Sequence, residues 1–356
     1  MIGDLEATLA ATEEWRSVGL KPRDALSAVA AARRLGLLRR PNPKAPSAEI
    51  RLSGRSHSVE RDGAAITHHY DVSNGFYRRM LGSTMVYSCA LFGSETESLD
   101  AAQRRKLDLI CKKLELKPGT RLLDIGCGWG SLLLHAAGRY GAQTVGVTVS
   151  TEQAELARER IRDAGLSDRC EVRVEDYRDI SDGPYDRIAS IGMFEHVGAE
   201  NLGLYFERIR ELLVPDGLLL NHGIVRTTAG RMNSRGFTNR FVFPDGELHT
   251  QAHVLQTLEE SGFELLDDES LRQHYAQTLR AWARNHDAHI AEAAAEIGEE
   301  RERVWRLHNH GAALGFESGR LSVHQVIAQP LATAKARPLR QRAYPADTTA
   351  FGSWFA

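Results

Sequence analysis

The chain has 356 residues, of which 42% are hydrophobic and 26% are charged, and its formal net charge at pH 7 is −2. This composition is ordinary for a globular protein, and a charge so close to zero argues against a general affinity for nucleic acid. No apolar run reaches about 18 residues, so no membrane-spanning helix is predicted. The four cysteines include no Cys-x-x-Cys pair, which argues against a zinc site or a disulfide framework and fits a reducing cytoplasm.

Residues 1–58 are predicted to form an N-terminal helical segment, with two short helices ahead of Pro41. Basic residues gather at the end of the second helix: Arg33, Arg34, Arg39 and Arg40. The simpler interpretation is that they complement the negative end of the helix dipole. The alternative is a basic, partly apolar arm that contacts an anionic membrane surface or a partner.

Two segments, 68–77 and 87–90, are dense in aromatic and polar residues. Neither has clean helical or strand periodicity over its length. Such mixed segments commonly line a binding site, although a packed N-terminal lid would look the same. An amphipathic helix is predicted over residues 99–116, and it leads into the first strand.

Residues 122–137 predict a short buried strand, a glycine-rich turn and a helix. Asp124 lies near the carboxyl end of the strand, where ligands bind in an open α/β sheet. The helix begins at Ser131. The glycines allow a tight turn and a close approach of backbone to ligand, and they are Gly126, Gly128 and Gly130.

Two nucleotide-type ligands compete for this turn. A dinucleotide fingerprint requires G-x-G-x-x-G, so that a pyrophosphate reaches the helix N-terminus. Here Ser131 stands in place of the last glycine, and Trp129 occupies a position where a pyrophosphate needs bare backbone. The turn therefore favours S-adenosylmethionine (SAM), which carries no phosphate. The remaining alternative is an ordinary strand-to-helix turn without a ligand.

Strand and helix patterns continue to alternate, which predicts an α/β fold with a mostly parallel sheet and helices on both faces. Six further strands complete a seven-stranded, Rossmann-like sheet, at residues 144–148, 171–174, 185–191, 217–225, 263–267 and 321–328. Two stretches do not fit a minimal sheet and are predicted to be helical lid insertions that set substrate specificity, at about residues 227–255 and 270–316. The tail, 330–356, is expected to be disordered.

Several motifs stand in a distinctive order along residues 60–328. They are HYDVSN at 69–74, YSCA at 87–90, LDIGCGWG at 123–130, GVTVS at 146–150 and MFEHVG at 193–198. The ordered set resembles the cyclopropane-fatty-acid synthase family of SAM-dependent methyltransferases, which includes the mycolic acid cyclopropane synthases. Residues 176–179 and 243–246 add to the match. The resemblance implies a class I SAM-methyltransferase domain over residues 59–329.

The resemblance also implies where SAM binds. The residues expected around the methionyl part, the ribose and the adenine are Tyr70, Tyr87, Ser88, Asp124, Gly126, Gly128, Thr148, Val149, Gln153, Asp176 and Tyr177. Many SAM enzymes place an acidic residue after the second strand. This chain has no acidic residue at that place, residues 147–149, and this departure from other SAM enzymes agrees with the family. Ser150 and Gln153 also have the spacing of a capping box, which gives Gln153 a structural alternative.

A bicarbonate site is implied around Cys89, Glu195, His222, the backbone of Ile224 and Tyr275. An isolated alkene is a weak nucleophile, so the enzyme must hold it in line with the sulfonium methyl in a dry pocket. Aromatic faces can stabilise the resulting carbocation, and bicarbonate can accept its proton. Each side chain also has an ordinary alternative: a small buried apolar residue for Cys89, a core histidine for His222, and lid packing for Tyr275.

The sequence thus predicts an enzyme that adds a methylene across the double bond of an unsaturated phospholipid acyl chain. The alternatives are a methylene- or methyl-branched acyl product, a small-molecule methyltransferase, and a SAM-binding protein without chemistry. No metal is expected. Larger family members carry an N-terminal lipid-engaging module, and this chain starts near where that module would end. A homodimer partner or the N-terminal helices are therefore expected to supply contact with the inner face of the membrane from the cytoplasm.

Overall fold

A computed structural model describes residues 5, 7–9, 22–34, 36, 46, 48–50, 52–70, 72–228 and 236–331. Within these ranges a single seven-stranded sheet has the order β3-β2-β1-β4-β5-β7-β6. The strands are β1 (Arg121–Ile125), β2 (Gln143–Thr148), β3 (Cys170–Val174), β4 (Tyr185–Ile191), β5 (Leu213–Arg226), β6 (Phe263–Ser270) and β7 (Leu321–Pro330). Only β7 runs antiparallel to its neighbours. The predicted mostly parallel, seven-stranded sheet is confirmed.

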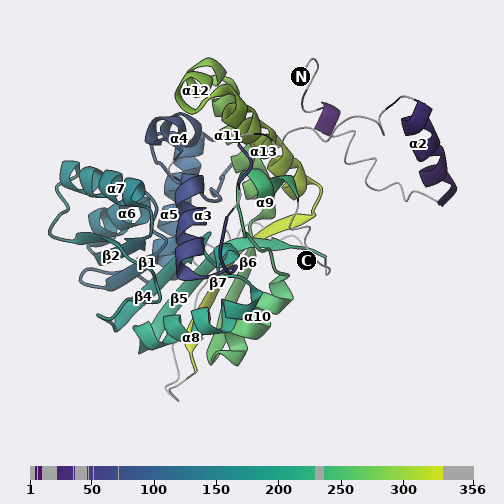
Figure 1. Cartoon of the computed structure of the whole chain (residues 1–356). Helices are drawn as coiled ribbons and strands as arrows, with labels where there is room; N and C mark the ends of the chain where they lie inside the picture. Colours follow the sequence, from purple (N-terminus) through teal and green to yellow (C-terminus); the bar gives the residue numbers. More distant parts are fainter. Residues whose placement is uncertain are drawn as a thin grey trace, which may run out of the picture.

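Both faces of this sheet are covered by helices, because successive residues of a strand point to opposite faces. Leu122 packs in a core with α5 (Leu99–Lys113) and α6 (Ser131–Tyr140). Leu123, the next residue of β1, packs on the other face with α8 (Leu202–Leu212) and α10 (Gln251–Glu260). Helix α7 (Thr151–Asp163) packs beside β3. The layers are visible in Figure 1.

The order of the strands reverses at β1. The chain passes from β1 to β2 and β3 on one side, and then returns to β4 on the other. The connections after β1 and β4 therefore leave the sheet in opposite directions, which opens a crevice at the carboxyl ends of these two strands. The glycine-rich turn stands at this crevice.

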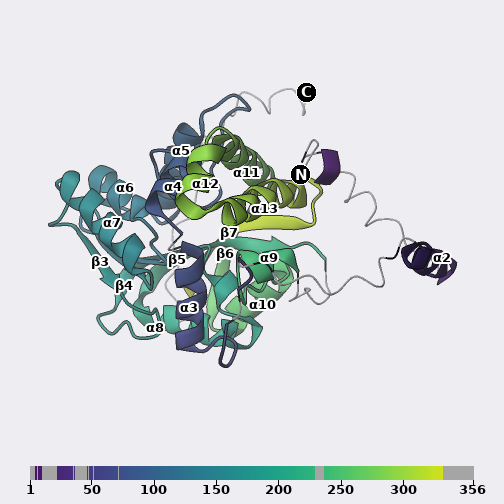
Figure 2. The same cartoon turned by 45° about the horizontal axis from the view of Figure 1, so that its top comes forward.

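A second group of helices covers the carboxyl edge of the sheet (Figure 2). It comprises α3 (Val59–Tyr70), α4 (Asn74–Leu81), α9 (Phe237–Phe241), α11 (Arg272–Asp287), α12 (Ile290–Ile297) and α13 (Glu299–Glu317). Segment 68–77 lacks clean periodicity in the sequence, yet it contains the end of α3 and the start of α4. The Ser73 hydroxyl caps α4 by accepting the N–H groups of Gly75 and Phe76, at 3.0 and 3.3 Å. This cap explains why a new helix begins there.

Helix α2 (Pro22–Arg34) lies away from the sheet and its helices in both views (Figures 1 and 2). Its Leu26 and Val29 are 73% and 55% exposed. None of the helices in the described ranges is long and apolar enough to cross a membrane. Arg39, Arg40 and the tail beyond Leu331 lie outside the described residues.

Candidate active site

A cleft of about 1140 Å³, open solvent included, lies at the carboxyl ends of β1 and β4. The turn after β1 forms its floor, and the ends of β2 and β3 form one wall. Helix α3 contributes Asp62 and Ile66 to the lining, and it crosses in front of the strands in Figure 1. The cleft is therefore the crevice expected where a doubly wound sheet reverses its strand order.

The glycine-rich turn exposes backbone to this cleft. Gly126 and Gly128 have φ angles of +79° and +54°, a conformation that side-chain-bearing residues rarely adopt. The bulky ring of Trp129 is held by α4, because its Nε1 donates to Asn74 Oδ1 at 2.8 Å. Backbone atoms therefore form the floor of the cleft.

The structure brings together in this cleft nearly all the residues that the sequence assigned to SAM. Ten of the eleven line it: Tyr87, Ser88, Asp124, Gly126, Gly128, Thr148, Val149, Gln153, Asp176 and Tyr177. Tyr70 is the last residue of α3, and its side chain lies outside the described part of the chain. The assigned contacts with the donor remain predictions.

Gln153 serves the helix and the cleft at once. Its backbone N–H donates to the Ser150 hydroxyl at 3.1 Å, which confirms Ser150 as the N-cap of α7. Its side-chain Oε1 accepts the Thr148 hydroxyl at 2.9 Å. The amide group is thereby held against the end of β2, at the edge of the cleft.

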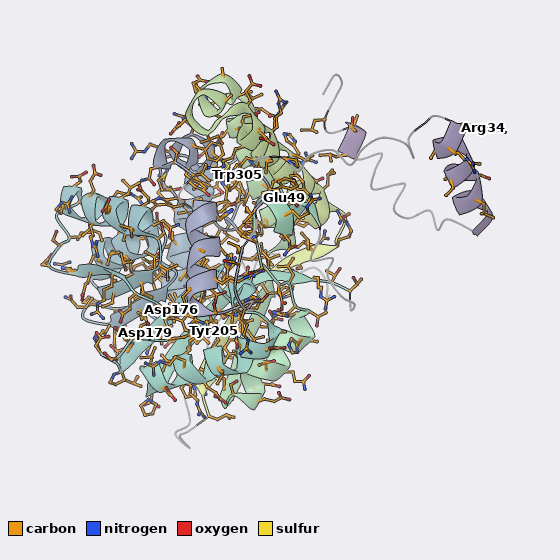
Figure 3. The ribbon with its side chains drawn as sticks, viewed as in Figure 1. Arg34, Glu49, Asp176, Asp179, Tyr205 and Trp305 are labelled. Carbon is orange, nitrogen blue, oxygen red and sulfur yellow. The ribbon has the colours of Figure 1, made fainter. Side chains whose placement is uncertain are left out.

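Asp176 lines the cleft, but its carboxylate already has a cationic partner. Arg178 donates to its two oxygens at 2.8 and 2.7 Å and also reaches Asp62 of α3 at 3.3 Å. These ion pairs tie the covering helix to the wall of the cleft. In Figure 3, Asp176 is labelled near one end of α3 and Trp305 near the other.

Next to the cleft that is predicted to hold the methyl donor (the donor cleft), aromatic rings from α3, α4, α11 and α13 pack together. His69 lies 4.0 Å from Phe243 and 5.0 Å from Trp305, measured between ring centroids. Tyr87 lines the donor cleft, and its ring centroid is 5.1 Å from that of Trp282. This aromatic compartment therefore adjoins the cleft at Tyr87.

None of the residues assigned to bicarbonate is among the described residues that line the cleft. Glu195 is on a 3-10 turn (Phe194–His196), four residues after the end of β4 at Ile191. Its Oε1 accepts the backbone N–H of Ile224 at 2.7 Å, so that N–H is already used. His222 is two residues earlier in β5 and shares a face of the sheet with Ile224.

Two more of the residues assigned to bicarbonate, Cys89 and Tyr275, lie at helix α11. The Cys89 thiol is buried and lies 3.7 Å from the carbonyl oxygen of Leu271. Leu271 is the residue that precedes α11, at its N-cap position. Tyr275 is one turn further along α11, and its ring packs against Phe316 at 4.6 Å between centroids. Cys89, Tyr275 and Ile224 share one apolar cluster. Packing of α11 against α13 is thus a role of Tyr275 that the structure shows, and a role in chemistry remains a prediction.

Several buried polar atoms here have no hydrogen-bond partner among the described residues. They are Glu195 Oε2, both ring nitrogens of His222 and both side-chain polar atoms of Gln325. Gln325 is directly opposite His222 in the β5–β7 ladder. Burial raises the pKa of Glu195 to about 7 and lowers the pKa of His222 well below its usual value. Unpaired buried polar groups are costly, so this set fits a small ligand such as bicarbonate that both donates and accepts hydrogen bonds.

Two residues near the site were missed in the sequence. One is Gln325, on β7, a strand of mixed apolar and polar residues. The other is Lys106, which is 1% exposed and lines the cleft beside Asp124. Its ammonium donates to the Ser88 hydroxyl at 2.9 Å. The sequence did contain a signal for Lys106, because it stands one turn before Ile110 on the predicted apolar face of the helix.

Asp124 gives the protein a testable pH dependence. Burial raises the pKa of its carboxyl from 3.8 to about 7 in the folded protein. The folded state therefore binds more protons than the unfolded state between these values, and the free energy of unfolding falls as pH rises through this window. We expect the stability of the ligand-free wild type, relative to Asp124→Asn, to decrease by about 1–3 kcal/mol from about pH 5 to about pH 7.5.

Denaturant unfolding at several pH values measures this difference. The exposed Glu259→Gln, on α10, is the control, and its stability relative to the wild type should not change over the same range. A wild-type–Asp124→Asn difference that is independent of pH would contradict the raised pKa.

Comparison with known proteins shows which family the chain is related to. A family model described as mycolic acid cyclopropane synthetase matches residues 57–326. A probable fatty acid methyltransferase of Pseudomonas putida is 44% identical over 279 residues, which cover 77% of this chain and 71% of that protein. The cyclopropane-fatty-acyl-phospholipid synthase of Escherichia coli (strain K12) is 37% identical over 259 residues, which cover 73% of this chain and 66% of that protein, slightly less than two thirds.

Solved structures of similar proteins agree with this relationship. The cyclopropane synthase MmaA2 from Mycobacterium tuberculosis superimposes with a TM-score of 0.72 at 34% identity, over 75% of this chain and 98% of that one. The mycolic acid cyclopropane synthase CmaA1, solved in complex with S-adenosylhomocysteine (SAH), superimposes with a TM-score of 0.71 at 33% identity, over the same shares. The chain therefore belongs to the mycolic acid cyclopropane synthetase family of SAM-dependent methyltransferases.

Proposed function

We propose that this methyltransferase adds a methylene group across the double bond of an unsaturated fatty acyl chain within a phospholipid. The observation that carries the proposal is the aromatic compartment beside the donor cleft. The buried Glu195 accepts the backbone N–H of Ile224, whose side chain packs in the same cluster as Tyr87 and Trp282. A carbon–carbon double bond needs an apolar, dry slot, and it needs no base before it attacks. A small-molecule O- or N-methyltransferase is disfavoured, because that compartment is built mainly from aromatic rings, with histidines such as His69 as its polar members.

The proposed reaction has two bond-forming steps. The π electrons of the alkene attack the sulfonium methyl of SAM, the carbon–sulfur bond breaks, and SAH leaves. The acyl chain then carries a carbocation. A proton is lost from the newly attached methyl group, and its bonding electron pair closes the three-membered ring. The net change is the gain of one CH₂ and the loss of the double bond.

The residues of this chain have distinct parts in the proposal. Tyr87 belongs to both the donor cleft and the aromatic compartment, so its ring can face the cationic carbon. The N–H of Ile224 fixes one oxygen of Glu195 and leaves the other without a partner among the described residues. Bicarbonate held by Glu195 and His222 would supply the base that accepts the proton. Its binding agrees with the unpaired buried atoms at this place.

One observation supports a second product. The Pseudomonas putida relative, at 44% identity, is named a probable fatty acid methyltransferase, whereas the cyclopropane-forming relative from Escherichia coli is 37% identical. A hydride shift in the same carbocation, followed by proton loss elsewhere, would give a methylene branch with an alkene retained. The acceptor, the donor and the first step are the same in both cases.

A phospholipid substrate requires contact with a membrane surface, which we place on helix α2. Its exposed Leu26 and Val29 can enter the lipid interface, and Arg33 and Arg34 in its last turn can contact anionic headgroups. The expected location is the inner face of the membrane. A homodimer remains a prediction from the sequence.

Mass analysis of acyl chains tests the proposal. The protein is incubated with SAM and phospholipid vesicles that carry cis-monounsaturated chains, with saturated vesicles as the control. We expect the unsaturated chains to gain one CH₂ and lose their double bond; a retained alkene would establish the branched product instead. Methylation of soluble acceptors without any change in the lipid would contradict the proposal. Equal turnover on neutral and anionic vesicles would contradict the assignment of headgroup contact to α2.

A further inference from the structure

Lys106 is a charged side chain buried in the donor cleft. It is 1% exposed, and its one polar contact among the residues that the structure describes is with the Ser88 hydroxyl at 2.9 Å. A hydroxyl group carries no charge, and an ammonium group has three hydrogens to donate. Buried lysines are almost always paired with an anion, because removing an unpaired charge from water is costly.

Another buried lysine on the same helix, Lys113, is paired with carboxylates. Lys113, two turns further along α5, is 4% exposed and pairs with Glu269 at 2.5 Å and Asp267 at 3.6 Å. Lys106 has no such ion pair with any residue that the structure describes. Asp124 lines the cleft with it and interacts electrostatically with it, yet the Oδ1 atom of Asp124 also lacks a partner there. Two opposite charges therefore border one cleft without contacting each other.

This arrangement matches a zwitterion. SAM and SAH end in an amino acid group, which has a carboxylate and an ammonium on the same carbon. The carboxylate is the only anionic group of either molecule. At the other end of the cleft, the charge of Asp176 is satisfied by Arg178. The unsatisfied charges are therefore at the end where Ser88 and the glycine turn are found.

We propose that Lys106 binds the α-carboxylate of the donor, while Asp124 faces its α-ammonium group. Lys106 would thus fix the methionyl end of SAM and help to orient the sulfonium methyl toward the aromatic compartment. Ser88 would hold the lysine side chain in place through the hydrogen bond already present. The assignment depends on SAM as donor and is independent of the identity of the methyl acceptor.

A second anion competes for Lys106. Cys89 and His222 also lie within electrostatic range of its ammonium group, so a bicarbonate ion could be the ligand instead. The two ligands are distinguished by comparing SAH with 5′-methylthioadenosine. Methylthioadenosine retains the adenine, the ribose and the sulfur but lacks the amino acid group, so it should be insensitive to Lys106.

Isothermal titration of Lys106→Met with both compounds tests the proposal. We expect the dissociation constant of SAH to rise about 10- to 100-fold, from the loss of a charged hydrogen bond, and that of methylthioadenosine to change less than about twofold. Lys113→Met is the matched control: a buried lysine on the same helix, outside the cleft, whose loss should leave both constants unchanged. Lys106→Gln, which removes the charge but keeps two N–H hydrogens to donate, replaces Lys106→Met if that variant does not fold.

Two outcomes would overturn the assignment. Equal weakening of SAH and methylthioadenosine would show that Lys106 supports the fold of the cleft and does not bind the carboxylate. Unchanged SAH binding, with a higher bicarbonate concentration needed for turnover, would assign Lys106 to the second anion. Neither outcome depends on whether the acyl product is a ring or a branch, so failure here is distinguishable from failure of the proposed function.

Discussion

Replacement of Glu195 by glutamine is expected to lower turnover about 100- to 10,000-fold, while the dissociation constant of SAH changes less than about twofold. The amide oxygen of glutamine can still accept the Ile224 N–H, so the local geometry should persist. The amide nitrogen of glutamine cannot accept a hydrogen bond, whereas Oε2 of Glu195, which has no partner among the described residues, can accept one from bicarbonate in the proposed reaction. SAH binding should survive because Glu195 is not in the lining of the donor cleft.

Turnover on unsaturated phospholipid vesicles and titration with SAH measure the two quantities separately. Glu200→Gln is the matched control, because Glu200 stands on the next 3-10 turn, is exposed and should leave turnover unchanged. If SAH affinity fell as much as turnover, Glu195 would belong to the donor site. If turnover stayed at the wild-type level, Glu195 would have no part in proton removal.

Gly223→Ala is expected to lower the free energy of unfolding by about 1–3 kcal/mol, and to reduce turnover as well. Gly223 lies in β5 between His222 and Ile224. A Cβ atom there would be 2.0 Å from Cε1 of Phe194, a ring that is only 2% exposed. The ring must therefore move, and Glu195 is the next residue along the chain.

Denaturant unfolding and a turnover assay of the same preparation measure both effects. Gly311→Ala is the control, because it lies in α13 with nothing within 4 Å of the added Cβ. That substitution should leave stability unchanged or increase it by about 0.5–1 kcal/mol, since alanine favours a helix. An unfolding free energy for Gly223→Ala equal to that of the wild type would show that the strand tolerates the contact.

Much of the donor cleft follows from short stretches of sequence. The strand, glycine turn and helix of residues 122–137 are local structures, and their pattern of apolar residues and glycines is read from neighbouring positions. The Ser150 cap is local in the same way. These segments meet at the carboxyl edge of one sheet, because parallel strands end at the same edge.

Helices α3 and α4 are not predicted by local patterns of apolar residues and glycines. Their polar and aromatic residues serve the cleft and the lid on several sides, so the helical period of apolar residues is obscured. His69, for instance, packs against Phe243, and its Nδ1 also donates to the carbonyl oxygen of Val242 at 2.8 Å. The stabilising contacts come from residues far along the chain, which a local pattern does not contain.

The sequence by itself determined the class of fold, the order of its strands and helices, and the turn on which the donor is expected to rest. Only the tertiary structure decided which polar groups are buried without partners: Lys106 in the cleft, and Gln325 opposite His222. The physical reason is that apolar periodicity and turn geometry are properties of consecutive residues. Whether a buried charge is paired depends on which distant segment folds against it.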